Sequence, residues 1–123
     1  MKKNFLFSMA VVFFLSSCHR EGQSGELLLV VSPKHHEQPI KGATVYVRYG
    51  AKELAGTSPS DFDLAVPGDS VSASVEVKNL RRGDYFLYAV GYDSTIAQVV
   101  SGGMHVKLKG KTGETDIDLA VTE

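Results

Sequence analysis

Residues 71–78 read VSASVEVK, and in this stretch apolar side chains alternate strictly with polar ones. A period of two places the three valines and Ala73 on one face of an extended chain, and the polar side chains on the other. This pattern predicts a β-strand with one face in a core and the other toward water. A shift of one residue would turn the whole apolar set outward, so the pattern also predicts the register of the strand.

Similar short runs lie on both sides of this stretch and are separated by glycine, proline and polar turn residues. No stretch has a convincing helical period. We therefore expect an all-β fold, a single antiparallel β-sandwich of about seven strands. The expected strands are residues 27–31, 43–49, 53–56, 61–66, 71–78, 84–92, 97–100, 104–109 and 115–121.

The N-terminus has the layout of a secretory signal, with Lys2 and Lys3 followed by an apolar run at residues 5–15. This run is too short for a transmembrane helix, which needs about 20 apolar residues. The sequence Leu15-Ser16-Ser17-Cys18 resembles the lipobox of bacterial lipoproteins. That resemblance implies cleavage before Cys18 and lipidation of its thiol. The alternative is a plain secreted protein with an incidental cysteine.

These features divide the chain into three parts. Residues 1–17 are the expected lipoprotein signal peptide, residues 18–25 a lipidated, flexible polar tether, and residues 26–123 one β-sandwich domain. Without Lys2 and Lys3, 11 basic residues stand against 14 acidic ones. This balance argues against nucleic acid as a partner. It also predicts that membrane attachment depends on the lipid and not on a polybasic patch.

Residues 79–93, NLRRGDYFLYAVGYD, are similar to a Leu-x-x-Gly-x-Tyr-x-Leu-x-Ala pattern followed by Gly-Tyr in carboxypeptidase-regulatory-like and transthyretin-like β-sandwiches. Residues 42–47, GATVYV, resemble an earlier strand of the same family. One departure is Pro67-Gly68-Asp69-Ser70, which replaces the usual acidic turn. The resemblance implies an Ig-like or transthyretin-like Greek key and a binding, spacing or docking module without catalytic residues of its own. We expect no cofactor. Physically, Tyr85 can bury its ring and send its hydroxyl to a loop backbone.

The outward face of residues 84–92 offers the candidate binding site. If Tyr85 and alternate residues after it point inward, the side chains between them point outward. Rigid aromatic rings there can stack on sugars or anchor a protein partner. The alternative is that these rings only shield neighbouring strands or lie under a loop. The candidate binding residues are Tyr46, Phe86, Tyr88 and Tyr92.

Metal sites and catalytic groups are not expected. Adjacent residues of an extended chain point to opposite sides, so His35 and His36 are poor joint ligands and are expected to be solvated loop histidines. Asp61, Asp63 and Asp69 lack the spacing of a calcium loop, and the first two also fit the polar face of a strand. The sequence has no nucleophile motif, and we expect no enzyme activity.

Two tripeptides, Asp69-Ser70-Val71 and Asp93-Ser94-Thr95, resemble the O-glycosylation acceptor used by one group of Gram-negative bacteria. Both fall at predicted turns or strand edges. Ser70 and Ser94 are therefore candidate glycosylation sites.

Together these features predict a small outer-membrane lipoprotein. The favoured function is a non-enzymatic accessory or protein-docking module of an envelope complex, and the alternative is a glycan-binding module in surface nutrient capture. Only one acid, Glu21, follows Cys18 closely, which favours the periplasmic leaflet over the cell surface.

Overall fold

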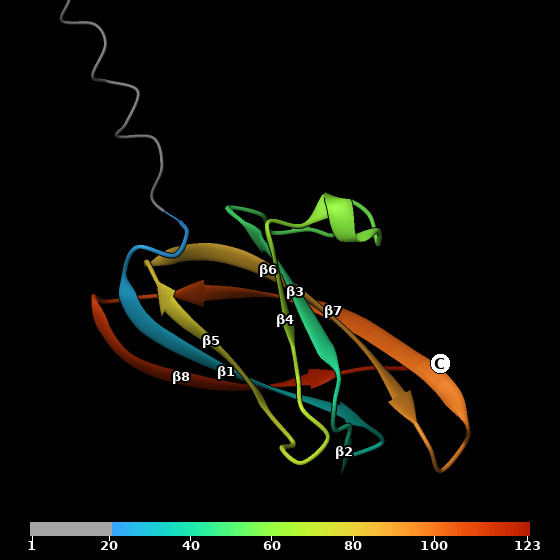
Figure 1. The fold of residues 1–123 in the computed structure, drawn as a ribbon. Coiled ribbons are helices and arrows are strands. Elements are labelled where there is room, and N and C mark those ends of the chain that lie inside the picture. The colour runs from blue at the N-terminus through green and yellow to red at the C-terminus, as the bar shows by residue number, and fades with distance from the viewer. Residues whose placement is uncertain (1–20) are drawn as a thin grey trace, which may run out of the picture.

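The computed structural model describes residues 21–123, so the predicted signal peptide and the lipidation site Cys18 lie outside the described residues. These residues form two packed β-sheets, and the expected all-β sandwich is confirmed, with eight strands (Figure 1). In the first sheet β1 (Glu26–His35) pairs with β2 (Gln38–Pro39), β5 (Val75–Leu80) and β8 (Thr112–Ala120). The second sheet has the order β4 (Leu64–Pro67), β3 (Thr44–Tyr49), β6 (Gly83–Asp93) and β7 (Gln98–Leu108).

One strand pair departs from the expected antiparallel arrangement. β8 runs parallel to β1, from Glu26 opposite Thr112 to Lys34 opposite Ala120, whereas every other strand pair is antiparallel. The topology explains the parallel pair. β7 ends beside Gly83, at the same end of the sandwich where β1 begins. Because the chain crosses to the first sheet at that end, β8 must run in the direction of β1.

The core lies between the sheets and is built from the alternating positions of their strands. Leu29 and Val31 of β1 and Val45 and Val47 of β3 are fully buried and belong to the same apolar cluster. Tyr85, Leu87 and Ala89 point inward, as predicted from the alternation in residues 84–92. The buried apolar side chains form one cluster that includes residues from both sheets.

The first half of VSASVEVK is not a strand, although its alternation is the most regular in the chain. Val75 and Val77 are buried in β5, but Val71 is 78% exposed. The carboxylate of Asp69 accepts hydrogen bonds from the backbone N–H groups of Val71 and Ser72. This side-chain turn satisfies backbone donors that a strand would give to its neighbour, so β5 begins only at Val75.

Two further expectations about strands were wrong, and the strand expected at residues 61–66 begins only at Leu64. Residues 53–56 form no strand, and a 3₁₀ helix (Pro59–Asp61) precedes β4. The two predicted strands 97–100 and 104–109 are one continuous strand, β7. Gly102 and Gly103 lie between them and pair with Ala89 and Tyr88 of β6, so the strand is not interrupted. A Cβ atom at Gly102 would collide with the carbonyl oxygen of Ala120.

Candidate functional site

Three of the four predicted outward aromatics lie together on the outer face of the second sheet. Tyr46 and Tyr88 are directly opposite each other on β3 and β6, and both are half-buried. Phe62 covers them: its ring stacks on Tyr88 with centroids 5.8 Å apart and lies 5.5 Å from the ring of Tyr46. Phe86 is half-buried on the same face, where its ring would meet any Cβ atom placed at Gly103. We call Tyr46, Phe62, Phe86 and Tyr88 the aromatic face.

In the predicted strand 61–66, alternation would place Phe62 on the same face as Leu64 and Val66, and the structure separates them. Leu64 and Val66 do pack against the core. Phe62 instead follows the 3₁₀ helix. Its backbone N–H donates to the carbonyl oxygen of Pro59, and the helix ends there. Phe62 and Asp63 lie in bends before β4, so the alternation of β4 does not extend to Phe62, which lies on the aromatic face. Pro59 was the available signal, because proline favours the first turn of a helix.

The fourth predicted aromatic, Tyr92, lies apart from this cluster, on the hairpin that joins β6 to β7. Its side chain is 56% exposed, and its cross-strand partner Val99 is 62% exposed. Ile96, in the turn between them, is exposed as well. We call residues 92–99 the far hairpin. A shallow hollow of about 210 Å³ beside it is lined by Pro39, Ile40, Tyr92 and Ser94, among others.

The two candidate glycosylation sites have the same local geometry. Ser70 and Ser94 are exposed and lie in turns. In each case the preceding aspartate accepts a hydrogen bond from the backbone N–H two residues later, at 2.9 Å: Asp69 from Val71, and Asp93 from Thr95. These turns place each serine at an exposed tip.

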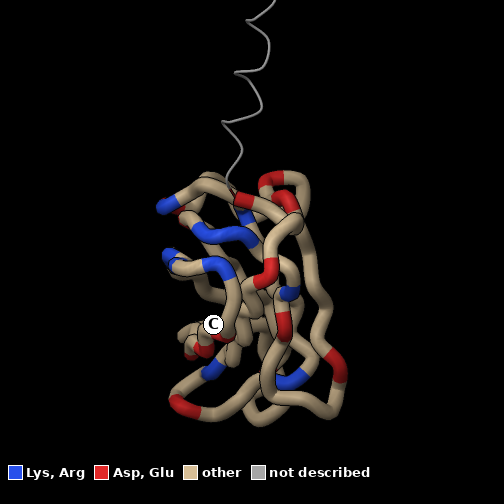
Figure 2. Tube along the Cα trace, turned by 90° about the vertical axis from the view of Figure 1, so that its left-hand side faces the viewer, with Lys and Arg blue, Asp and Glu red and all other residues tan. Residues whose placement is uncertain are grey.

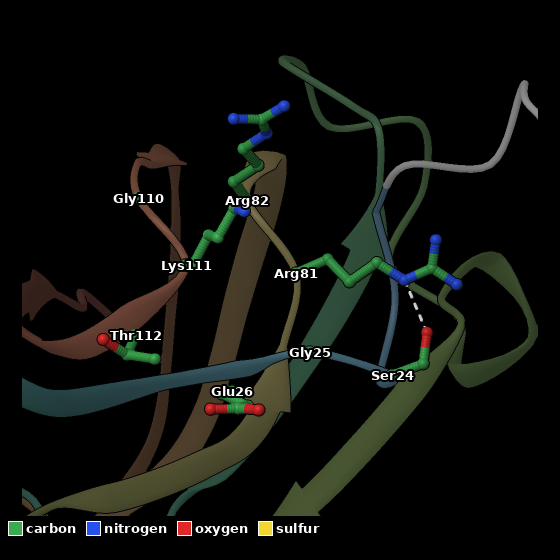
Figure 3. Close-up of a pocket in the computed structure, with 8 residues that line it drawn as sticks. All are labelled: Ser24, Gly25, Glu26, Arg81, Arg82, Gly110, Lys111 and Thr112. Carbon is green, nitrogen blue, oxygen red and sulfur yellow. Dashed lines mark hydrogen bonds between the residues drawn. The ribbon is translucent and has the colours of Figure 1, made fainter.

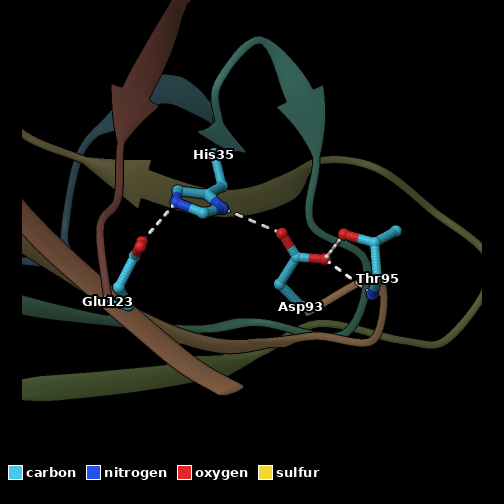
Figure 4. A network of polar contacts seen from close by, with 4 residues as sticks. All are labelled: His35, Asp93, Thr95 and Glu123. Atoms are coloured by element: carbon cyan, nitrogen blue, oxygen red, sulfur yellow. Dashed lines mark hydrogen bonds and ion pairs between the residues drawn. The ribbon is translucent and has the colours of Figure 1, made fainter. Parts of the chain in front are cut away.

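His35 is buried, which corrects the expectation of a solvated loop histidine. It ends β1, its side chain is 3% exposed, and both ring nitrogens contact carboxylates (Figure 4). Nδ1 lies 2.8 Å from Asp93 and Nε2 lies 2.7 Å from Glu123. Asp93 raises the pKa of His35 more than burial lowers it, and Glu123 raises it further. The cost of burying the ring is thus compensated, because His35 pairs with the carboxylate of Asp93 on one side and with that of Glu123 on the other.

The same contacts lower the pKa values of the two carboxylates, Asp93 and Glu123. Hydrogen bonds from the Thr95 hydroxyl and from His35 lower the pKa of Asp93 to about 2. The backbone N–H of Glu123 and then His35 lower the pKa of the Glu123 side chain. The Thr95 hydroxyl donates to Asp93 at 2.6 Å, and both imidazole nitrogens are taken by carboxylates. Thr95 is therefore not placed as a nucleophile activated by His35.

His35 and His36 were expected to point to opposite sides, and this was wrong. Their ring centroids are 4.2 Å apart, because His36 has a φ of 52° and leaves the extended chain. Together with Glu123 they form the one group of three potential metal ligands among residues 21–123, with ligand atoms within 4.8 Å of one another. A metal ion would have to displace the bond between His35 and Glu123.

The three acids considered as calcium ligands, Asp61, Asp63 and Asp69, each accept hydrogen bonds in a different part of the chain. Asp61 caps the 3₁₀ helix through the N–H of Ser58, and Asp63 accepts from the N–H of Tyr49. The N–H groups of Ser72 and Val71 lower the pKa of Asp69. Each carboxylate thus stabilises its own loop, and the three do not form a metal-ligand group in the part of the chain that the structure describes.

Residues 21–25, predicted as flexible tether, pack on the sandwich. The buried Gly22 N–H lies 2.9 Å from the hydroxyl of Tyr85, and that hydroxyl donates to Arg81 O at 2.7 Å. Gly25 N–H donates to Asn79 O, and the Glu21 side chain accepts from Asp84 N–H. The expected bond from Tyr85 to a loop backbone is confirmed. We call this end of the molecule the entry end.

No protein-family model matches the chain, and no curated protein is significantly similar to it. Residues 21–123 contain no helix that is long and apolar enough to cross a membrane.

Proposed function

We propose that this protein is a membrane-anchored lipoprotein of the bacterial envelope whose carboxypeptidase-regulatory-like, transthyretin-like sandwich is a non-enzymatic docking module for an envelope protein. The observation that carries the docking role is the far hairpin. Tyr92, Ile96 and Val99 expose an apolar surface there, at the opposite end of the sandwich from residues 21–25 (Figure 1). Exposed aromatic and aliphatic side chains beside a hollow are typical anchors of protein interfaces.

The arrangement of the two ends supports the anchoring role. Cys18 precedes Glu21 by three residues, and residues 21–25 are fixed to the entry end. A lipid on Cys18 would hold the entry end at the outer-membrane surface, on the periplasmic leaflet in our proposal. The far hairpin would then point away from the membrane, where a protein partner is accessible.

The aromatic face supports docking more than the glycan-binding alternative. A sugar that stacks on Tyr88 needs an open ring face, and Phe62 lies stacked on this ring. Tyr92 is the exposed aromatic of the four predicted residues. A protein partner can use Tyr92 together with Val99, which offers no flat surface to a sugar.

Site-specific photo-crosslinking tests the docking role in living cells. A photoreactive amino acid at Tyr92 or Val99 should yield one discrete crosslinked protein. The matched control is Asp116, which is exposed on β8. The double change of Tyr92 and Val99 to serine should remove stoichiometric co-purification of that protein. A crosslink from Asp116 alone would contradict the proposal. Glycan-array binding that Tyr92→Ala abolishes would instead support the alternative.

Anchoring has its own test. Cells grown with an alkyne fatty acid should label the full-length chain, and Cys18→Ala should remove the label. Mass spectrometry of the mature N-terminus should find an acylated Cys18. An unacylated mature chain in the culture fluid would overturn the anchoring role.

A further inference from the structure

We infer that the entry end carries a second membrane contact, a basic surface that binds the phosphate groups of anionic lipids. This inference rests on the proposed anchoring, and it names what the sandwich itself contributes. It revises the prediction from composition, where acids outnumber bases, that membrane attachment depends on the lipid and not on a polybasic patch. The fold, however, gathers basic residues from two turns at one place (Figure 2).

The surface is built around a hollow of about 440 Å³ that lies where the chain enters the first strand. Ser24, Gly25 and Glu26 line one side, and the others come from the turn before β6 and the turn before β8. Arg82 and Lys111 rise from these two turns on the same side of the hollow, whereas Arg81 points toward Ser24 (Figure 3). We call this the basic hollow.

A neighbouring hollow of about 260 Å³ extends the basic surface. It shares Arg82 and Gly110 with the basic hollow, and it adds Lys107 and Lys109 at the end of β7. The basic residues of the two hollows other than Arg81 are all exposed: Arg82, Lys107, Lys109 and Lys111. No described residue forms an ion pair with Arg82, Lys109 or Lys111.

The nearby acids compensate this charge only in part. Glu21 accepts the N–H of Asp84, and Asp84 is paired with His105 at 2.8 Å. Glu26 is the one acid that lines either hollow. In Figure 2 the basic segments gather on one side of the entry end, and acidic segments lie on the other. The basic side therefore has a local excess of positive charge.

Chain length identifies the occupant. An extended chain spans at most about 3.6 Å per residue, so the Cα atom of an acylated Cys18 lies within about 11 Å of that of Glu21. Glu21 lies against Gly83, the residue after Arg82, so a lipid on Cys18 would bring phosphates near the basic hollow, where unscreened attraction extends about 8 Å at physiological salt. Lipid phosphates are thus the anions that the anchor would bring to the basic hollow. Arginine can pair with phosphate through two hydrogen bonds, and lysine adds a mobile charge.

Vesicle sedimentation tests the inference without the anchor. Residues 21–123 hold both sheets and the described core, so a chain from residue 18 with Cys18→Ser keeps the whole fold. It should bind vesicles of phosphatidylglycerol and phosphatidylcholine, and it should not bind pure phosphatidylcholine. High salt should release it.

Paired variants locate the surface. Arg82→Gln with Lys111→Gln should weaken binding by about tenfold or more. The matched control, Lys34→Gln with Lys41→Gln, removes the same charge near the far end and should bind as before. Circular dichroism and thermal melting should show that both variants are folded.

Three results would overturn the inference: equal binding to neutral vesicles, equal loss in the control pair, or equally tight binding to a duplex oligonucleotide. None of these depends on lipidation. Failure of acylation at Cys18 would appear only in the labelling experiment, so the two failures can be told apart.

Discussion

Tyr85 connects the interior of the sandwich to the N-terminal segment. Its ring is buried and its hydroxyl bridges Arg81 O and Gly22 N–H. Hydroxyl groups that bond back to the backbone a few residues earlier occur in other β-sandwiches at the same kind of corner. Burial raises the pKa of Tyr85, so the hydroxyl stays protonated and can donate.

Tyr85→Phe should lower the free energy of unfolding by about 2 kcal/mol, because two buried backbone groups lose their partner. Urea denaturation measures this change. Tyr88→Phe is the matched control, since its hydroxyl has no hydrogen-bond partner among the described residues. The control should change stability by less than about 0.5 kcal/mol. Equal effects of the two substitutions would show that the hydroxyl bridge does not stabilise the fold.

The network around His35 predicts how stability depends on pH. The raised pKa of His35 stabilises the fold below the unfolded value of 6.5, and this contribution disappears as the pH rises through the folded pKa. The lowered pKa values of Asp93 and Glu123 have the opposite pH dependence: their contribution to stability is lost at low pH. They stabilise the fold above the unfolded values of 3.8 and 4.5, and they cease to do so as the pH falls toward the folded pKa, which for Asp93 is about 2.

Thermal stability should therefore be greatest between pH 4.5 and 6.5 and should decrease on both sides. His35→Gln should lower the melting temperature and flatten the decrease above pH 6.5. His105→Gln is the control: its pair with Asp84 is exposed, so the decrease should remain. A series of calorimetric melts across this range gives the answer. An unchanged profile in His35→Gln would contradict the assignment.

At the scale of elements, alternation predicted which side chains face the core wherever a strand formed. In β3 and β6 the inward residues are those expected from the sequence. Alternation did not show where strands begin and end, because side-chain hydrogen bonds decide that. Asp69 keeps residues 71–72 out of β5, and the bends at residues 62–63 place Phe62 on the face opposite to Leu64. His35 was missed because its partners, Asp93 and Glu123, are distant in sequence.

Val71 and Val77 share one predicted face but have different surroundings, so they test where β5 begins. Val77→Ala leaves a cavity in the core and should lower the free energy of unfolding by about 2 kcal/mol. Val71→Ala removes an exposed side chain and should change it by less than about 0.5 kcal/mol. Chemical denaturation of both variants measures the difference. A large loss in Val71→Ala would place residues 71–74 in the core.

At the scale of the whole molecule, the two ends of the sandwich differ in chemistry. The entry end combines the bound residues 21–25 with the basic hollow, and the far end exposes Tyr92 and Val99. The sequence could place single aromatic and basic residues on turns. Only the fold shows that these turns gather the charges at one end and the apolar hairpin at the other.

The parallel pairing of β1 with β8 has a consequence for biosynthesis. β1 begins at Glu26, and the strand that covers its second edge begins at Thr112. A nascent chain that lacks its last segment therefore leaves a row of unpaired amide and carbonyl groups along β1, where another chain can add as a strand. Contacts so remote in sequence also form slowly. Assembly of the first sheet is thereby delayed until residues 112–120 have been synthesised, so shorter nascent chains stay open to pairing with other strands.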